Sequence, residues 1–403
     1  MNKKWKNVKL EDVVDILDNL RKPITKRDRI EGDYPYYGAT GILSYVNDYI
    51  FSEKLVLIGE DGAKWDSGDN TAFIVEGKYW VNNHAHVIRP NRDKVLDEWI
   101  VYYINYRDLS PFVTGMTVPK LNQKNLRSIP IPLPPLPKQH RIVSILDHCF
   151  EAIDKAKANA EQNLQNAKEL FESYLQGVFE ERGEGWEEKR LGKVCNIIGG
   201  GTPSKSKKEY YEGSIPWATV RDMKKFYLDS TQFNITKEAV ENSSTNVIEK
   251  GNVIIATRVG LGKVCLLEQD TAINQDLKGI IPKQGYEINK DYLFYWFQSI
   301  ENFLVNSGTG MTVKGVRVDF VKSILFPFPS IAKQEEIVSW LDNIYTKSQN
   351  LEFYYQKRID DLEELKKSIL QKAFAGELKT EKMVEETPLA PISESVCCEA
   401  EKI

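Results

Sequence analysis

The stretch Lys138-Gln139-His140-Arg141-Ile142-Val143-Ser144 returns 195 residues later as Lys333-Gln334-Glu335-Glu336-Ile337-Val338-Ser339, and this repeat decides how the chain is organised. The register holds without a gap from residue 115 to residue 179, beginning at Gly115-Met116-Thr117-Val118 and its copy Gly310-Met311-Thr312-Val313. Chance does not keep one offset over such a length. The chain is therefore an internal duplication.

Upstream of this repeat the two halves correspond only at scattered anchors. Trp5 aligns with Trp186, and Pro35 aligns with Pro216, both at an offset of 181 residues. The residues that follow each proline differ strongly between the halves. Each half therefore consists of a variable globular region followed by a shared tail. A shared frame with different inserts indicates one mechanical role and two different specificities.

Each shared tail begins with a proline-rich run and continues as a long helix. Alternating prolines cannot sit in a central strand, so the runs at 128–137 and 324–329 predict an edge strand or an extended crossover. Proline and glycine are absent from Lys138 to Gln176 and from Ile331 to Ala375. This absence predicts two helices of about 40 residues, each spanning roughly 60 Å.

Apolar residues in the second helix recur every seven positions, which is typical of a coiled-coil seam. Its two heptad columns are Ile337, Ile344, Leu351, Arg358 and Leu365, and Leu341, Ser348, Tyr355, Leu362 and Ile369. The matching columns of the first helix are small at their centre, where they carry Ala156, Ala160 and Ala167, and end at Leu170 and Tyr174. This complementarity of size predicts that the helices pack against each other. The alternative is two unrelated amphipathic helices, each lying on its own domain.

The predicted fold class is α+β, with two globular domains separated by two long antiparallel coiled-coil helices. Because the chain is duplicated, antiparallel pairing would give the monomer a pseudo-twofold axis. Duplex DNA has a twofold symmetric backbone, and dimeric DNA-binding proteins exploit the match.

Composition limits the class of protein without identifying a partner. The chain has 403 residues, 41% hydrophobic and 28% charged, as globular domains do. No apolar run approaches the roughly 20 residues of a membrane-spanning helix, and no signal peptide is recognisable, so we expect a cytoplasmic protein. The net charge of −4 is that of residues 375–403 alone, whereas residues 186–330 carry +3. A local DNA-binding patch is thus permitted but not predicted by charge.

Recognisable catalytic and metal-binding motifs are missing from the sequence. The five cysteines form no Cys-x-x-Cys pair and the four histidines show no zinc spacing, so no metal site is predicted. His84 and His86 alternate as on one strand face, and a metal pair there is the alternative. Neither a Gly-x-x-x-x-Gly-Lys-Ser/Thr loop nor the amino-methyltransferase motif Asn-Pro-Pro-Tyr/Phe occurs. These absences favour a protein that depends on catalytic partners.

Over residues 1–375 the sequence resembles the specificity subunit of type I restriction–modification enzymes. The segments that carry the resemblance are Pro-Leu-Pro-Lys-Gln-His-Arg-Ile-Val (135–143), Ile-Ala-Lys-Gln-Glu-Glu-Ile-Val (331–338), Tyr-Tyr-Gly-Ala-Thr-Gly (36–41), Asn-Asn-His-Ala-His (82–86), Gly-Gly-Thr-Pro-Ser (200–204), Ile-Pro-Trp (215–217) and Ala-Thr-Arg-Val-Gly (256–260). Together these segments are specific, whereas any one alone is weak.

The resemblance implies a non-catalytic subunit that directs others to double-stranded DNA. Its partners would be two modification (methyltransferase) subunits and restriction (translocase/endonuclease) subunits. The target would be two short half-sites separated by a fixed spacer. S-adenosylmethionine, ATP and Mg would be bound by the partners, with no cofactor in this chain. The implied segments are a first target recognition domain (1–137), a first spacer helix (138–180), a second target recognition domain (186–330), a second spacer helix (331–375) and an acidic tail (376–403).

A bipartite reader needs hydrogen-bonding side chains at the base edges and cations or amides at the phosphates. Loops in both halves supply such side chains beside glycines that let the backbone approach closely. The candidates in the first half are Arg21, Lys26, Tyr37, Thr40, Lys64, His84, His86, Lys120, Asn122 and Lys124. Those in the second half are Thr202, Ser204, Lys205, Arg221, Arg258, Asn274, Gln275 and Lys314. Arg258 and Asn274-Gln275 stand out because each follows or sits in a predicted strand.

Two other functions remain open on the sequence alone. A duplicated domain can be a protein-interaction scaffold, which would be indifferent to DNA even with its partners present. A hydrolase or nuclease with an unrecognised site would instead show metal-dependent activity in the isolated chain.

Overall fold

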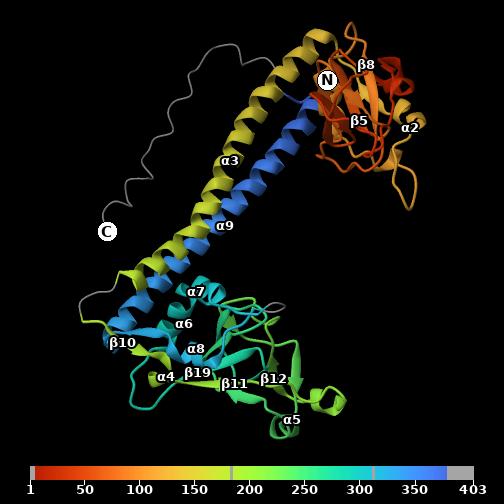
Figure 1. The fold of residues 1–403 in the computed structure, drawn as a ribbon. Helices are drawn as coiled ribbons and strands as arrows, with labels where there is room; N and C mark the ends of the chain where they lie inside the picture. The colour runs from red at the N-terminus through yellow and green to blue at the C-terminus, as the bar shows by residue number, and fades with distance from the viewer. Residues whose placement is uncertain (1–4, 182–184, 311–313, 379–403) are drawn as a thin grey trace. The chain divides into compact units, whose positions relative to one another are not determined.

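The computed structural model describes residues 5–181, 185–310 and 314–378. Two compact units divide the chain: unit 1 comprises residues 1–160 and 357–403, and unit 2 comprises residues 161–356. Both long helices contribute residues to both units. Each unit therefore consists of a sheet-containing domain and one segment of each long helix (Figure 1). From residue 379 onward the predicted acidic tail lies outside the described residues, as does 311–313 of the second repeat.

Unit 1 is built on two small sheets. The first has the strand order β2-β8-β5-β6 and the second has the order β4-β3-β7. The strand bounds are Val14–Ile16 (β2), Tyr34–Gly38 (β3), Gly41–Val46 (β4), Leu55–Gly59 (β5), Ala72–Val75 (β6), Trp80–Val81 (β7) and Ala85–Pro90 (β8). Every residue of β5 is buried, as expected of a short apolar strand in the middle of a sheet. Helix α1 (Asp97–Tyr106) packs on β5 and β6 through its buried face.

Unit 2 repeats this plan with one more strand in each of the two sheets. One sheet has the order β11-β19-β16-β17-β13 and the other has the order β14-β12-β18-β15. The strand bounds are Cys195–Gly199 (β11), Ile215–Ala218 (β12), Tyr227–Leu228 (β13), Phe233–Ile235 (β14), Asn246–Ile248 (β15), Val253–Ala256 (β16), Val264–Leu267 (β17), Thr271–Ile273 (β18) and Leu277–Pro282 (β19). Helix α6 (Lys290–Ser299) buries six consecutive residues from Tyr292 to Phe297, so protein surrounds this stretch.

Short helical elements connect the strands. Their bounds are Leu10–Asp12 (η1), Asp18–Leu20 (η2), Ser110–Phe112 (η3), Gln123–Arg127 (α2), Leu191–Val194 (α4), Lys208–Tyr211 (η4), Lys237–Glu241 (α5), Glu301–Asn306 (α7) and Val318–Ser323 (α8). Among the described residues, no helix combines the length and the apolar content needed to cross a lipid bilayer.

Both proline-rich runs form edge strands, as predicted. Strand β9 (Pro130–Pro132) pairs antiparallel with β1 (Asn7–Lys9), and β20 (Leu325–Phe328) pairs antiparallel with β10 (Glu187–Arg190). Each pair stands as a two-stranded sheet, where the N–H groups that proline lacks are not needed for a second neighbour. The duplication therefore extends from the sequence to the strand pairing.

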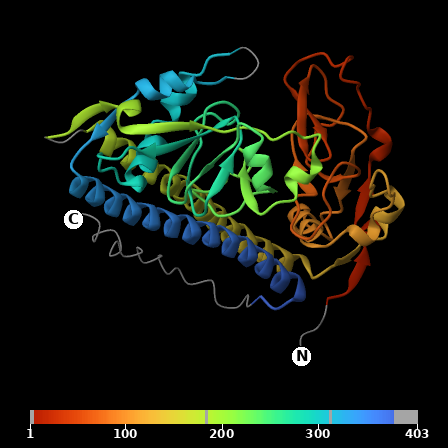
Figure 2. The same ribbon diagram turned by 90° about the horizontal axis from the view of Figure 1, so that it is seen from below.

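The two long helices, α3 (Leu136–Glu180) and α9 (Ile331–Ala375), lie side by side in both views (Figures 1 and 2). In unit 1, Lys157 bonds to Glu363 at 2.6 Å and Asp154 bonds to Lys366 at 3.0 Å. Because the residue number rises on one helix as it falls on the other, the helices are antiparallel. The predicted class, an α+β protein with two long antiparallel helices, is confirmed.

The buried stripe of these helices departs from the predicted heptad columns. Leu351 and Leu365 are 38% and 47% exposed, whereas Ile359 and Leu370, outside those columns, are buried. Tyr174, predicted in the seam of the first helix, is also 43% exposed. A straight helix has 3.6 residues per turn and drifts by about 20° per heptad against a strict seven-residue repeat. The seam therefore moves onto neighbouring positions along each helix.

Candidate nucleic-acid interface

A hollow of about 550 Å³ opens on unit 2 beside the ends of strands β12 and β18. Five of the eight candidates from the second half lie on its wall, namely Thr202, Lys205, Arg221, Asn274 and Gln275. The remaining lining residues, which sequence reasoning missed, are Tyr211, Trp217, Thr219, Val220, Phe233, Val259 and Asp276. Aromatic, amide and cationic groups thus share one wall, as nucleic-acid recognition requires.

Parallel strand pairing brings these residues together. The backbone N–H of Asn274, directly after β18, donates to the carbonyl of Ala218 at the end of β12 at 3.0 Å. Strands β12 and β18 are parallel, so the residues after both strands emerge at the same edge of the sheet. The hydroxyl of Thr202 donates to the side-chain oxygen of Gln275, and both residues line the hollow.

The loop that begins at Gly201 also lines the hollow, beside the residues that follow β12 and β18. The carbonyl of Gly201 accepts hydrogen bonds from the indole of Trp217 at 3.1 Å and the hydroxyl of Thr245 at 2.6 Å. A Cβ atom added at Gly201 would lie 2.5 Å from the backbone of Ser244, which leaves no room for a side chain. The loop that carries Thr202 and Lys205 is therefore held in place by the buried part of the unit.

Arg258 stands beside this hollow on the loop after β16 (Val253–Ala256). Its guanidinium lies 3.6 Å from the carboxylate of Asp276, and its side chain is 56% exposed. Lys278 is close by: burial lowers the pKa of its ammonium, Asp276 raises it, and Arg258 lowers it further. Lys314 is exposed, and Ser204 is exposed with its hydroxyl 2.8 Å from that of Ser206.

Unit 1 presents the corresponding loops at the corresponding strand ends. The backbone N–H of Asn82, after β7, donates to the carbonyl of Tyr37 on β3 at 3.0 Å. This contact matches the one between Asn274 and Ala218. The side-chain oxygen of Asn82 accepts the N–H of His84 at 2.7 Å, just as that of Asn274 accepts the N–H two residues later at 3.2 Å. His84 itself is exposed and pairs with Asp61.

Two candidates of unit 1 turn out to be interior residues. His86 is fully buried, with one ring nitrogen 2.6 Å from Asp18 and the other 2.6 Å from the carbonyl of Leu121. The guanidinium of Arg21 donates to Glu60 at 2.5 Å and its side chain is largely buried. For His86, the sequence could not predict this, because strand alternation does not say which face is inward. Arg21 follows the short helix η2, and its partner Glu60 is 39 residues away in the sequence. We leave both residues out of the proposed contacts.

The carboxylates around His86 form a buried charge cluster. Burial raises the pKa of Asp18, but the hydrogen bond and charge of His86, together with the N–H of Val87 and Arg21, lower it below its ordinary value. Ligand atoms of Asp18, Glu60 and His86 lie within 4.8 Å of one another, close enough for one metal ion. Arg21 and Lys120, at 2.5 and 2.8 Å from Glu60, already supply the cations there. We therefore assign no metal to this cluster.

The other candidates of unit 1 are spread over its surface. Lys26, Thr40, Lys64 and Lys124 are exposed. Tyr37 is partly buried, and burial raises the pKa of its phenol. Asn122 caps helix α2 by accepting the N–H of Asn125 at 2.9 Å, a role that its position before a short helix could have indicated.

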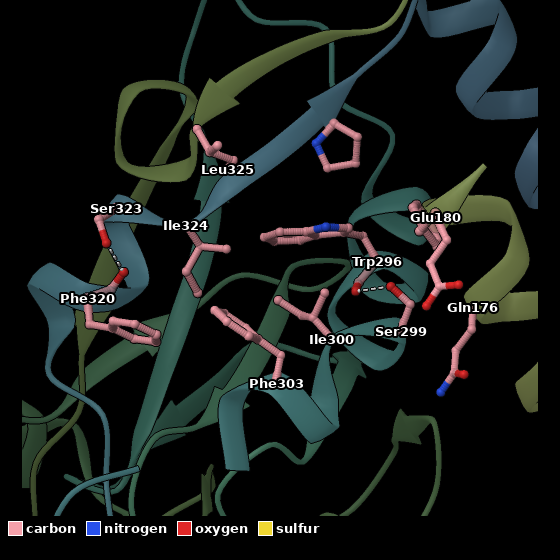
Figure 3. Close-up of a pocket in the computed structure, with 12 residues that line it drawn as sticks. Gln176, Glu180, Trp296, Ser299, Ile300, Phe303, Phe320, Ser323, Ile324 and Leu325 are labelled. Carbon is pink, nitrogen blue, oxygen red and sulfur yellow. Dashed lines mark hydrogen bonds between the residues drawn. The ribbon is translucent and has the colours of Figure 1, made fainter. Parts of the chain in front are cut away.

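A second, apolar hollow of about 890 Å³ lies on unit 2 (Figure 3). Trp296, Phe303 and Phe320 form its walls, and the hydroxyls of Ser299 and Ser323 both donate to backbone carbonyls. None of its lining residues is basic. It therefore offers nothing to a phosphate backbone, and we do not include it in the interface.

Comparisons with known proteins agree on one family. A family model described as the type I restriction modification DNA specificity domain matches residues 2–164 and 183–360. The chain is 31% identical over 334 residues to the specificity subunit of the Escherichia coli type I restriction enzyme EcoR124I/EcoR124II, covering 78% of this chain and 79% of that protein. It is 27% identical to the putative type I restriction enzyme specificity subunit S.HindORF215P of Haemophilus influenzae, covering 86% and 89%.

Solved structures show the same fold. A chain from a structure of a type I R-M system aligns with a TM-score of 0.74 at 20% identity, covering 94% of this chain and 99% of that one. The HsdS subunit from Thermoanaerobacter tengcongensis aligns with a TM-score of 0.58 at 20% identity, covering 94% and 98%.

Proposed function

This chain belongs to the type I restriction–modification DNA specificity family, and from that premise we propose that its two units read the two halves of a bipartite duplex target. It is a DNA specificity subunit, in a family that recognises DNA targets rather than catalysing a reaction on them. The finer proposal is that each unit reads one short half-site through the loops after β3 and β7 or after β12 and β18.

One observation carries this proposal. Equivalent loops, held by equivalent backbone hydrogen bonds, present different polar side chains in the two units. Conserved geometry with altered hydrogen-bonding groups is what two different base sequences require. In unit 2 those groups gather around the hollow that holds Arg221, Asn274 and Gln275.

We further propose that the chain performs no chemistry itself. Two methyltransferase subunits would bind it, one for each copy of the repeated frame, and restriction subunits would complete the assembly. S-adenosylmethionine, ATP and Mg would then be held by these partners. The duplication supports a pair of modification subunits, because a repeated frame offers the same docking features twice.

Methylome sequencing tests this function directly. Cells that carry the accompanying methyltransferase gene are compared with and without this chain. We expect one bipartite methylated motif that depends on the chain, and the motif would reveal both half-sites. An unchanged methylome, with the methyltransferase shown to be expressed and active, would contradict the proposal and favour a scaffold that binds only proteins.

A further inference from the structure

In both units a carboxylate lies against a nitrogen-bearing side chain at corresponding loops, and the two partners are exchanged between these loops. In unit 1, the carboxylate of Asp61 follows β5 and pairs with His84, which follows β7. In unit 2, the guanidinium of Arg258 follows β16 and pairs with Asp276, which follows β18. The acid and its nitrogen partner have therefore exchanged loops between the two units.

Backbone hydrogen bonds establish that the loops correspond. The N–H of Glu60 donates to the carbonyl of His84 at 2.8 Å, and the N–H of Thr257 donates to the carbonyl of Asp276 at 2.9 Å. Glu60 and Thr257 each immediately precede the first member of the pair in the sequence. The same backbone hydrogen bond therefore connects the two loops in each unit, and the side chains of the pair differ.

In both pairs the nitrogen-bearing side chain is exposed and the carboxylate is largely buried. The side chains of His84 and Arg258 are 50% and 56% exposed, whereas those of Asp61 and Asp276 are 18% and 14% exposed. In each unit, a recessed carboxylate holds an outward-facing nitrogen group. Each outward-facing group therefore lies beside a carboxylate that could limit its orientation.

A third position beside each pair also differs between the two units. Lys120 of unit 1 bonds to Glu60 at 2.8 Å and lies 3.9 Å from Asp61. The repeat places Gly315 at its position in unit 2, where an added Cβ would lie only 3.1 Å from the Cγ of Arg258. Removing the lysine side chain thus makes room for the arginine. The two units therefore differ at three neighbouring positions of this framework and not at one.

We propose that these outward-facing groups read bases, and that Arg258 reads a guanine in the half-site of unit 2 while His84 reads a base of the other half-site. This inference rests on the proposed function. A guanidinium fork matches the O6 and N7 acceptors of guanine in the major groove. Asp276 is then a positioning residue that restricts the rotamers of Arg258 before DNA arrives.

The test uses the whole chain together with its modification subunit. The methylated motif is sequenced for the wild type, Arg258→Ala, Arg258→Lys and Asp276→Asn. The matched control is Lys237→Ala, which removes an exposed cation of unit 2 that does not line the hollow. We expect Arg258→Ala to make one G·C position of a single half-site degenerate, while the other half-site and the control motif stay unchanged. Asp276→Asn should relax the same position by a smaller factor.

Each result decides between base reading and its alternatives. A motif that stays intact while methylation slows at all sites, and that Arg258→Lys restores, would make Arg258 a phosphate contact and overturn the inference. If Arg258→Ala abolishes methylation, duplexes are selected from a randomised pool with the same complex, and the selected half-site is compared in the same way. His84→Ala should change one position of the opposite half-site. If the wild type yields no motif, the proposed function itself fails.

Discussion

The side-chain oxygen of Gln334 accepts a hydrogen bond from the backbone N–H of Asn289 at 2.9 Å, at the start of the second long helix. The amide nitrogen of the same side chain donates to the carbonyls of Glu287 and Pro329. Gln139 makes the same three contacts in unit 1, with Leu96, Lys94 and Pro134. The repeated Lys-Gln motif therefore joins each helix to the domain that precedes it.

We expect Gln334→Ala to destabilise the protein by about 2–4 kcal/mol, because it leaves buried backbone groups without partners. Gln349→Ala is the control on the same helix, since Gln349 is exposed and its side chain donates to the nearby Glu352 at 3.1 Å. Its effect should stay within about 0.5 kcal/mol. Urea unfolding of the full chain measures the loss of stability for both variants. Equal losses would show that the Gln334 side chain does not stabilise the contact between the helix and the preceding domain.

The buried stripe of the second long helix predicts different losses of stability for alanine substitutions at two leucines about one turn apart. Leu362 is buried, whereas Leu365 is nearly half exposed despite its place in a heptad column. We expect Leu362→Ala to cost about 2–4 kcal/mol, because it opens a cavity, and Leu365→Ala to cost well under 1 kcal/mol. Thermal unfolding compares the two. Because Leu362 also belongs to a heptad column, a comparable loss for both leucines would restore the strict heptad.

The buried cluster of unit 1 should make stability depend on acid. The pKa values of Asp18 and Glu60 lie below their ordinary values in the folded protein. Their stabilising contribution is complete above the unfolded pKa of about 4 and is lost as the pH falls through the lower, folded pKa. We expect Asp18→Asn to be less stable than the wild type at pH 7 and to lose less stability on acidification.

Urea unfolding at neutral and at acidic pH measures this difference. Asp93→Asn provides the control, because Asp93 is exposed. A parallel acid response of Asp18→Asn and the wild type would mean that the cluster contributes no pH dependence.

Lys124 tests a phosphate contact, since it is exposed on helix α2, whereas Lys120 is already paired with Glu60. We expect Lys124→Ala to reduce the slope of log affinity against log salt by about 0.9, the release of one counterion. Fluorescence anisotropy of the full complex on duplex DNA across a salt series gives the slope. A wild-type slope would remove Lys124 from the interface.

Both long helices contribute residues to both units, so their length should influence the spacing of the half-sites. Inserting one heptad into each helix adds about 10 Å of helix. We expect the accepted spacer to change by about three base pairs at 3.4 Å each. Sequencing of the methylated motif measures it, and an unchanged spacer would exclude the helices as a ruler.

Local sequence patterns were enough to predict the frame of this protein. An unbroken 195-residue offset, the proline runs and the absence of proline and glycine predicted the duplication, the edge strands and both helices. These features follow from backbone chemistry, because proline removes an N–H and helix formation depends on neighbouring residues.

Only the tertiary structure decided which candidates meet. The sequence pattern proposes His86 as a DNA contact alongside His84, and it singles out Arg258 because that residue follows a predicted strand. Strand pairing buries His86 between Asp18 and Leu121 and sets Arg258 against Asp276, 18 residues further along the chain. Such contacts depend on how distant strands align and on what fills the space between them. A one-dimensional pattern records neither. The sequence could therefore predict the duplicated domains and the two long helices, but not which candidate side chains are buried and which are exposed.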